Sequence, residues 1–235
     1  MLRSVSLVLL LAGLALFAGC QDGTEPNAPG AKPAENKAQP GRAETAMLEE
    51  AAHGNTAAVK GWLEKGVDVN MRGADSNTPI MEAAFAGHME TVKMLLDHGA
   101  DLSAKKKDGE TVNSLAAAHQ DIIELFKSVT ALVEASSKGD LKAAQALIAK
   151  GTPVNGRDIY GQSALMEASW NGKTELVKLL LEKGANPNIK KADGETPLSL
   201  ANAQKHQDVA ALLTAALAQG PKTNPPATPS PAAAK

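Results

Sequence analysis

The stretch Thr78-Pro79-Ile80-Met81-Glu82-Ala83-Ala84 decides the fold of this chain, because its residue types return downstream. Ser163-Ala164-Leu165-Met166-Glu167-Ala168-Ser169 repeats it after 85 residues, and Thr196-Pro197-Leu198-Ser199-Leu200-Ala201 repeats it after a further 33. Each copy begins with a hydroxyl side chain, which suits a helix N-cap, and two copies then place a proline at the first helical position. The small alanines that follow keep the helix thin. The stretch therefore predicts a short helix that recurs along the chain.

A second helix follows each copy at the same spacing. Val92 to Leu96 and Val177 to Leu181 both place apolar residues at helical intervals, which predicts a buried helix face. Each of these helices is expected to end at a glycine, since a left-handed residue is favoured there. The expected glycines are Gly66, Gly99, Gly151 and Gly184.

Intervals of 33 residues separate Gly54 from Gly87, and also Thr78 from Thr111. These segments resemble ankyrin repeats, and the resemblance covers nearly all of residues 46–218. It implies an all-α solenoid of six helix-turn-helix repeats with disordered flanks. In such a solenoid a hairpin, here called a finger, joins one helix pair to the next, and each repeat is buried only against its neighbours.

A longer period lies above the repeats. A shift of 85 maps Met81-Glu82-Ala83 onto Met166-Glu167-Ala168, so the six repeats form a duplicated triplet, with repeats 1–3 over 46–128 and repeats 4–6 over 129–218. From Asp121 to Ala135 the sequence contains no glycine and no finger. Two readings stay open: one continuous solenoid with a trimmed loop, or two lobes that meet at an angle. The lost finger contacts predict that the join near Ser128 is the weakest interface.

The flanks have a different composition. Nine of the 13 prolines lie before or after the repeats, among alanine, lysine, asparagine and threonine, a composition that cannot bury enough apolar surface to fold. Residues 20–45 are therefore predicted to be a disordered tether and residues 219–235 a disordered tail. Residues 1–19 combine the basic Arg3 with an apolar stretch too short to span a bilayer, which predicts a secretory signal peptide.

Cys20 is the only cysteine and ends the run Leu16-Phe17-Ala18-Gly19-Cys20. This ending resembles the lipobox of bacterial lipoproteins, which implies lipidation of Cys20 and a membrane anchor facing the periplasm. Gln21 stands where an aspartate would favour the inner membrane, so the outer membrane is favoured. An uncleaved anchor, or an ordinary signal peptide with a chance cysteine, is the alternative.

Composition and motifs argue against catalysis and nucleic-acid binding. Removing residues 1–19 takes away Arg3 and moves the formal net charge from −2 to −3, whereas phosphate binding needs a concentrated basic surface. The five histidines show no metal-ligand spacing, and no phosphate-binding or nucleophile motif appears. We therefore expect no enzyme activity, no cofactor and no metal site. Glu82 and Glu167 are equivalent in the two triplets, so duplication explains them better than acid–base chemistry.

Recognition is the more informative search, because exposed aromatic side chains commonly anchor interfaces. Phe85 and Trp170 are equivalent under the 85-residue shift and follow the small-residue segment, while Tyr160 lies on a finger tip. With Glu82 and Glu167 they are the predicted partner-binding residues. The alternative is that the rings merely cover a neighbouring repeat. The finger lysines are either a solvated face or a contact for an anionic group. They are Lys105, Lys106, Lys107, Lys190 and Lys191.

The resemblance therefore implies a monomeric, non-catalytic module that binds another protein. Together with Cys20 it predicts an ankyrin-repeat lipoprotein of the bacterial envelope that acts as an adaptor or stabiliser, or as an immunity-type inhibitor of a toxin. The alternative function is binding of an anionic lipid or cell-wall ligand through the finger lysines.

Overall fold

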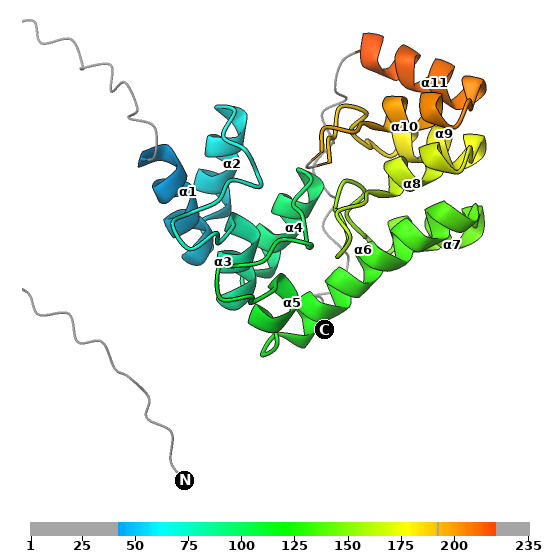
Figure 1. Ribbon diagram of the computed structural model, residues 1–235. Helices are drawn as coiled ribbons and strands as arrows, with labels where there is room; N and C mark the ends of the chain where they lie inside the picture. Colours follow the sequence, from blue (N-terminus) through cyan, green and yellow to red (C-terminus); the bar gives the residue numbers. More distant parts are fainter. Residues whose placement is uncertain (1–41, 192, 220–235) are drawn as a thin grey trace, which may run out of the picture. The chain divides into compact units, whose positions relative to one another are not determined.

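The computed structural model describes residues 42–191 and 193–219, in which eleven helices follow one another (Figure 1). Their bounds are α1 Arg42–Ala52, α2 Thr56–Glu64, α3 Pro79–Phe85, α4 Met89–Asp97, α5 Val112–Leu115, α6 Gln120–Lys138, α7 Leu141–Ala149, α8 Ala164–Trp170, α9 Thr174–Glu182, α10 Pro197–Ala203 and α11 Gln207–Ala218. Between these helices the described residues form only isolated β-bridges. The expected all-α architecture is confirmed.

Several sequence predictions lie outside the described residues. They concern the signal peptide over 1–19, Cys20, the tether up to residue 41 and the tail from residue 220 onward. The first helix begins at Arg42, four residues before the predicted start of the repeats. Among the helices that the structure does describe, none combines the length and apolar character needed to cross a membrane.

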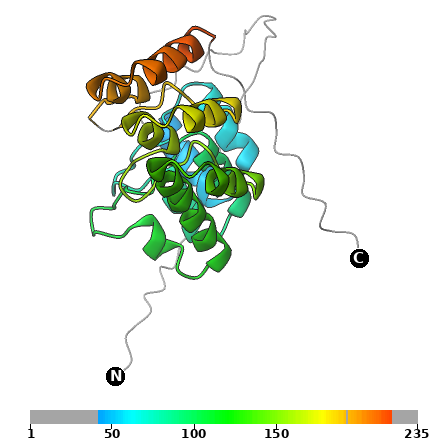
Figure 2. The ribbon, with the colours of Figure 1, turned by 90° about the vertical axis from the view of Figure 1, so that its right-hand side faces the viewer.

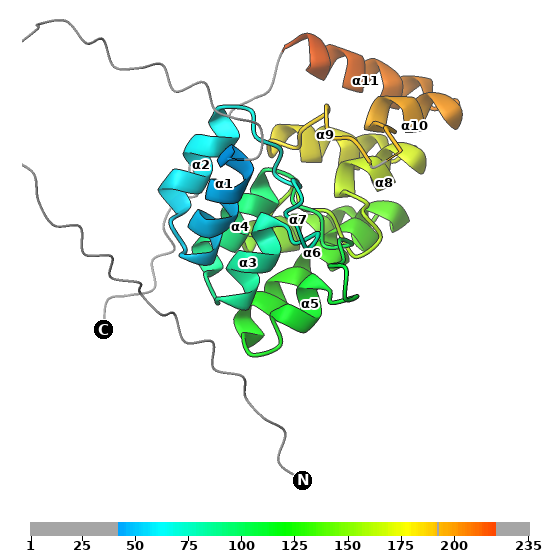
Figure 3. The same ribbon diagram turned by 60° about the vertical axis from the view of Figure 1, so that its left-hand side comes forward.

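The helices form two rows. The first helices of successive repeats pack side by side, α1 on α3 and α3 on α5, as Figure 3 shows, and α8 packs on both α6 and α10. The second helices also pack in order, α2 on α4, α4 on α6, α7 on α9 and α9 on α11. In Figure 2 the orange and red helices α10 and α11 cover the yellow helices α8 and α9. Each repeat thus contributes one helix to each row.

Side-chain caps fix where the first helices begin, with one exception. The Thr196 hydroxyl accepts the N–H of Ser199 at 3.1 Å, and Ser163 accepts the N–H of Met166 at 3.3 Å. The predicted cap at Thr78 is wrong: its hydroxyl receives no helix N–H and is buried without a hydrogen-bond partner. Pro79 already occupies the first helical position there, where one fewer N–H needs a partner.

Histidines tie neighbouring repeats together. The Nε2 atom of His88 lies 2.9 Å from the Ala52 carbonyl oxygen, His119 lies 3.2 Å from that of Phe85, and His206 lies 3.0 Å from that of Trp170. Since a carbonyl only accepts, Nε2 carries the donating proton in each case. These carbonyls belong to the last turns of first helices, where intrahelical partners are missing. The structural role expected for His88 is confirmed.

The helix α6 joins the two triplets without a break. Its first half serves as the second helix of repeat 3, and its second half, which packs on α7 and α8, serves as the first helix of repeat 4. One apolar cluster runs from Met47 to Val129 and the other from Leu132 to Leu213, so the division between the cores falls inside α6. The triplets therefore share a helix but have separate cores.

Candidate functional site

Four fingers lie between the helix pairs, over residues 66–78, 99–111, 151–163 and 184–196. The four glycines expected at their starts all adopt left-handed φ angles of +86° to +92°. An asparagine links each finger to its successor within a triplet. Asn70 donates to the Gly99 carbonyl at 3.1 Å and accepts the Asp101 N–H at 2.8 Å. Asn155 makes the equivalent pair of bonds to the next finger, at 3.3 and 2.7 Å.

The missing third finger does not leave a gap. The N–H of Arg157 donates to the Ala100 carbonyl at 3.1 Å, and the N–H of Leu102 donates to the Arg157 carbonyl at 3.2 Å, so the second finger contacts the third of the four directly. The expectation that finger contacts are lost at the join is therefore wrong. The fingers of repeats 2 and 4 become neighbours because repeat 3 contributes none.

The Arg157 side chain strengthens this contact. Its Nε donates to the Gly99 carbonyl at 3.2 Å and its Nη1 to the Lys190 carbonyl at 3.0 Å, while Nη1 lies 3.6 Å from the Asp101 carboxylate. Arg157 is only 6% exposed. One buried guanidinium therefore joins three fingers, and sequence reasoning missed it because the equivalent Arg72 is exposed.

The predicted aromatic residues are exposed. Phe85 is 65% exposed, Tyr160 75% and Trp170 42%, whereas Trp62 and Phe126 pack in the first apolar cluster, as expected. The fourth exposed large apolar side chain of the described residues is Ile159, at 43%. Sequence reasoning missed Ile159, although its place beside Tyr160, in the turn between Asp158 and Gly161, was a usable signal. Exposure makes these side chains available to a partner; their binding role stays a prediction.

Trp170 borders a hollow of about 240 Å³ between the first helices and the last two fingers. The residues that line it are Gln162, Met166, Glu167, Trp170, Lys191, Glu195 and Leu200. Each has a counterpart 85 residues earlier, in Asn77, Met81, Glu82, Phe85, Lys106, Glu110 and Leu115. The structure therefore brings Glu167 together with Trp170, and the same residue types recur around Glu82 and Phe85.

The two glutamates lie in different halves of the molecule and do not form a carboxylate pair. Each accepts a hydrogen bond from an amide: Asn77 Nδ2 lies 2.5 Å from Glu82 Oε1, and Asn171 Nδ2 lies 3.3 Å from Glu167 Oε2. The amide comes from a finger in one half and from the end of α8 in the other. Both carboxylates are thus oriented rather than free to rotate.

The finger lysines divide into two groups. Lys106 lies 2.7 Å from Glu110, and Lys191 lies 2.6 Å from Glu195. These hydrogen bonds to glutamate raise the pKa of Lys106 and of Lys191 above the usual lysine value. The N–H of Glu110 bonds the Asp108 carboxylate and lowers its pKa. Lys105, Lys107 and Lys190 are exposed and show no printed ion pair in the described fingers, so their side chains remain solvated.

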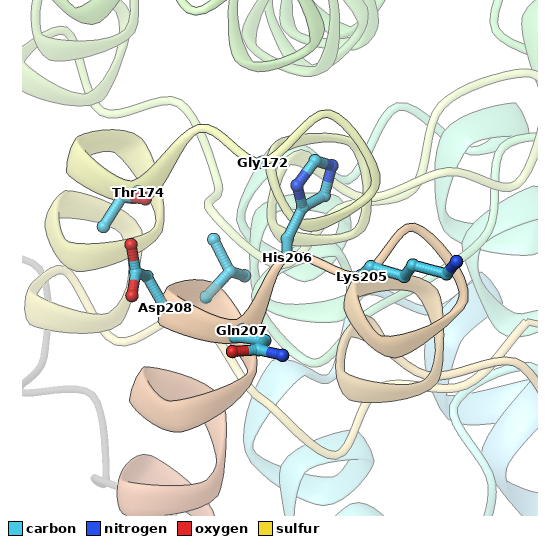
Figure 4. A pocket seen from close by; sticks show the side chains of 7 residues that line it. Gly172, Thr174, Lys205, His206, Gln207 and Asp208 are labelled. Atoms are coloured by element: carbon cyan, nitrogen blue, oxygen red, sulfur yellow. The ribbon is translucent and has the colours of Figure 1, made fainter.

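A second hollow, of about 330 Å³, lies where α10 turns into α11. Figure 4 shows the His206 ring beside the turn at Gly172, with Lys205 directed away from it. Because His206 already bonds the Trp170 carbonyl, this hollow is a by-product of the tie between repeats. Within the described ranges no group of three or more His, Cys, Asp and Glu side chains is arranged to hold a metal ion.

A family model described as ankyrin repeats (3 copies) matches residues 47–128, 102–191 and 132–224. The overlapping matches cover the described helices and span the join within α6. No curated protein matches the sequence closely enough to count as a relative.

Proposed function

The chain belongs to the ankyrin-repeat family, and on that premise we propose that it binds a partner protein through the finger side of its first helices. Ankyrin repeats generally form non-catalytic interaction modules. The observation that supports the location is the placement of the exposed apolar side chains. Trp170 faces a hollow shared with two fingers, Phe85 is its counterpart, and Ile159 and Tyr160 occupy a finger tip.

The proposal includes a place in the cell. The lipobox-like ending at Cys20 supports a lipid anchor on the periplasmic side of a bacterial membrane, with the repeats held away from it by the proline-rich segment. Stable anchoring requires more than one acyl chain, as bacterial lipoproteins typically carry. The partner is accordingly an envelope protein, and the chain acts on it as an adaptor, stabiliser or inhibitor.

Binding of an anionic lipid or cell-wall ligand has less support. Lys106 and Lys191 are the lysines closest to the first helices, and each is already neutralised by a glutamate and an aspartate of its own finger. Lys105, Lys107 and Lys190 remain for such a contact, but they are dispersed over two fingers. Exposed lysines of this kind need no ligand to explain them.

The experiment is an affinity measurement on the partner captured from envelope extracts. The double variant Phe85→Ala with Trp170→Ala removes two anchors, and truncation of a buried interface aromatic commonly costs 2 kcal/mol or more, about thirtyfold in affinity. Helicity and thermal midpoint should stay close to wild type, because neither ring belongs to a core cluster.

The matched control is the triple variant of Lys105, Lys107 and Lys190 to serine, which changes the same fingers without removing an ion pair. We expect it to alter chiefly the salt dependence of binding. If the aromatic double variant binds normally while the lysine variant does not, the lysine-based alternative replaces this proposal.

A further inference from the structure

The duplication places the same surface in both halves of the molecule. An exposed aromatic ring, Phe85 or Trp170, ends the first helix of the middle repeat of each triplet, and a glutamate precedes it by three residues. Residues three apart on a helix are neighbours on one face. The finger that follows adds a lysine–glutamate pair in each half. We call these surfaces the Phe85 subsite and the Trp170 subsite.

Charge complementarity indicates what docks on these rings. In the Trp170 subsite the glutamates Glu167 and Glu195 face a single lysine, Lys191, which is already 2.6 Å from Glu195. The Phe85 subsite repeats this balance with Glu82, Glu110 and Lys106. Each ring therefore stands beside a carboxylate that has no cation of its own among the described residues. Aromatic faces attract cations, Arg most often, and Arg also bonds carboxylates through two parallel N–H groups.

The glutamates are prepared for such a contact. Asn77 and Asn171 each bond one carboxylate oxygen, which leaves the other oxygen of Glu82 and of Glu167 available. The rings are held from behind as well, since His119 and His206 bond the carbonyls of Phe85 and Trp170. Preorganised groups lose little side-chain entropy on binding, so they suit recognition better than freely moving ones.

We propose that the two subsites are equivalent docking points for basic side chains, so that the partner protein presents the same basic element twice, as a symmetric dimer or a tandem repeat does. The cation stacks on Phe85 or Trp170 and bonds the adjacent glutamate. This inference rests on the proposed function, since it specifies the chemistry of the partner that the same surface binds. Two linked contacts strengthen one another through their effective concentration, so each can be weak alone.

The test uses acetyl-arginine amide as the probe, because the partner is unidentified, and acetyl-citrulline amide as its neutral isostere. The sequence contains two tryptophans, so the full chain carrying Trp62→Phe reports Trp170 alone by its fluorescence. Arginine should give a saturable change that weakens in high salt, and citrulline should give none. Glu167→Gln, in the same background, should weaken arginine binding about tenfold, with circular dichroism confirming the fold.

The Phe85 subsite is read in the mirror variant, which combines Trp62→Phe, Phe85→Trp and Trp170→Phe. Arginine should again give a saturable change, and Glu82→Gln should weaken it about tenfold. An equal response to arginine and citrulline, or affinities unchanged within twofold by both glutamate variants, would overturn the cation specificity. A response at only one subsite would overturn their equivalence. Neither result touches the proposed function, which fails only if the Phe85→Ala, Trp170→Ala variant keeps its affinity for the captured partner.

Discussion

Replacing Arg157 with alanine tests whether one side chain closes the row of fingers at the join. The change removes a bond to the Gly99 carbonyl at 3.2 Å, a bond to the Lys190 carbonyl at 3.0 Å and the contact with Asp101. The backbone bonds that Arg157 makes with residues 100 and 102 stay in place. The variant therefore isolates the contribution of the guanidinium.

The size of the effect follows from what each former partner retains. Gly99 keeps the Asn70 amide as a donor, Asp101 keeps the N–H of Ser103, and Lys190 is exposed enough for water to replace the lost bond. No acceptor is left orphaned, so the low end of the range for hydrogen bonds from a charged donor applies, about 1.5 kcal/mol each. Two such bonds give a destabilisation of about 3 kcal/mol.

Arg72→Ala is the matched control, because Arg72 occupies the same place in the first finger. Its Nη1 donates to the Lys105 carbonyl at 3.1 Å, but the side chain is exposed, so its removal should cost at most about 1 kcal/mol. Urea denaturation of both variants gives the difference. Hydrogen exchange should also accelerate across Lys127 to Leu132 in Arg157→Ala alone. Equal destabilisation by the two variants would refute the reasoning.

Three further predictions follow from other parts of the chain. Cys20→Ser should abolish both palmitate labelling and membrane association, and retention of either would contradict lipidation. Gly172→Ala should destabilise more than Gly151→Ala by about 2 kcal/mol or more in thermal unfolding: both glycines have positive φ, but only at Gly172 would a Cβ lie 2.6 Å from the His206 ring, so an equal loss would exclude the clash. Burial raises the pKa of Asp97 above 3.8, so folding disfavours its charged form and stability falls as pH rises through that raised pKa. Asp97→Asn should therefore stabilise at neutral pH by about 0.5–1 kcal/mol, since it also removes a negative charge from the C-terminal end of α4, and the gain should vanish below the ordinary carboxyl pKa; a gain that persists there would contradict the linkage.

The repeats could be predicted from sequence because their determinants are local. Gly66 and Gly184 adopt the left-handed conformation that their place at a helix end predicts, and Thr196 caps its helix through its own hydroxyl. Thr78 has the same local pattern but forms no cap, since its hydroxyl is buried away from the helix N–H groups. That difference depends on packing and not on spacing.

The role of Arg157 could not be predicted for a related reason. Arg72 and Arg157 are the same residue at equivalent places, and both donate to the next finger of their own triplet. Only Arg157 has another finger packed against its other side, because repeat 3 lacks one. Its burial follows from which segments become neighbours in space, and a local pattern carries no such information.

The candidate site was largely predictable, with the charges as the exception. Phe85, Tyr160 and Trp170 are exposed, as their places in the repeat predicted. Lys106 and Lys191 looked like free cations in the sequence, yet each hairpin folds back so that a glutamate four residues later pairs with the lysine. The net sign of the surface therefore changes from basic to acidic once the hairpins form.

The shared helix α6 has a consequence for how the chain folds. In a repeat array, each new unit normally has to start its own helices after a turn, and helix initiation is the slow, unfavourable step. Across α6 the last unit of one triplet continues into the first unit of the other by simple elongation of Gln120–Lys138. Order can therefore spread from either triplet into the other without a second nucleation event. A proline placed midway along α6 would restore that barrier and give two halves that fold one after the other.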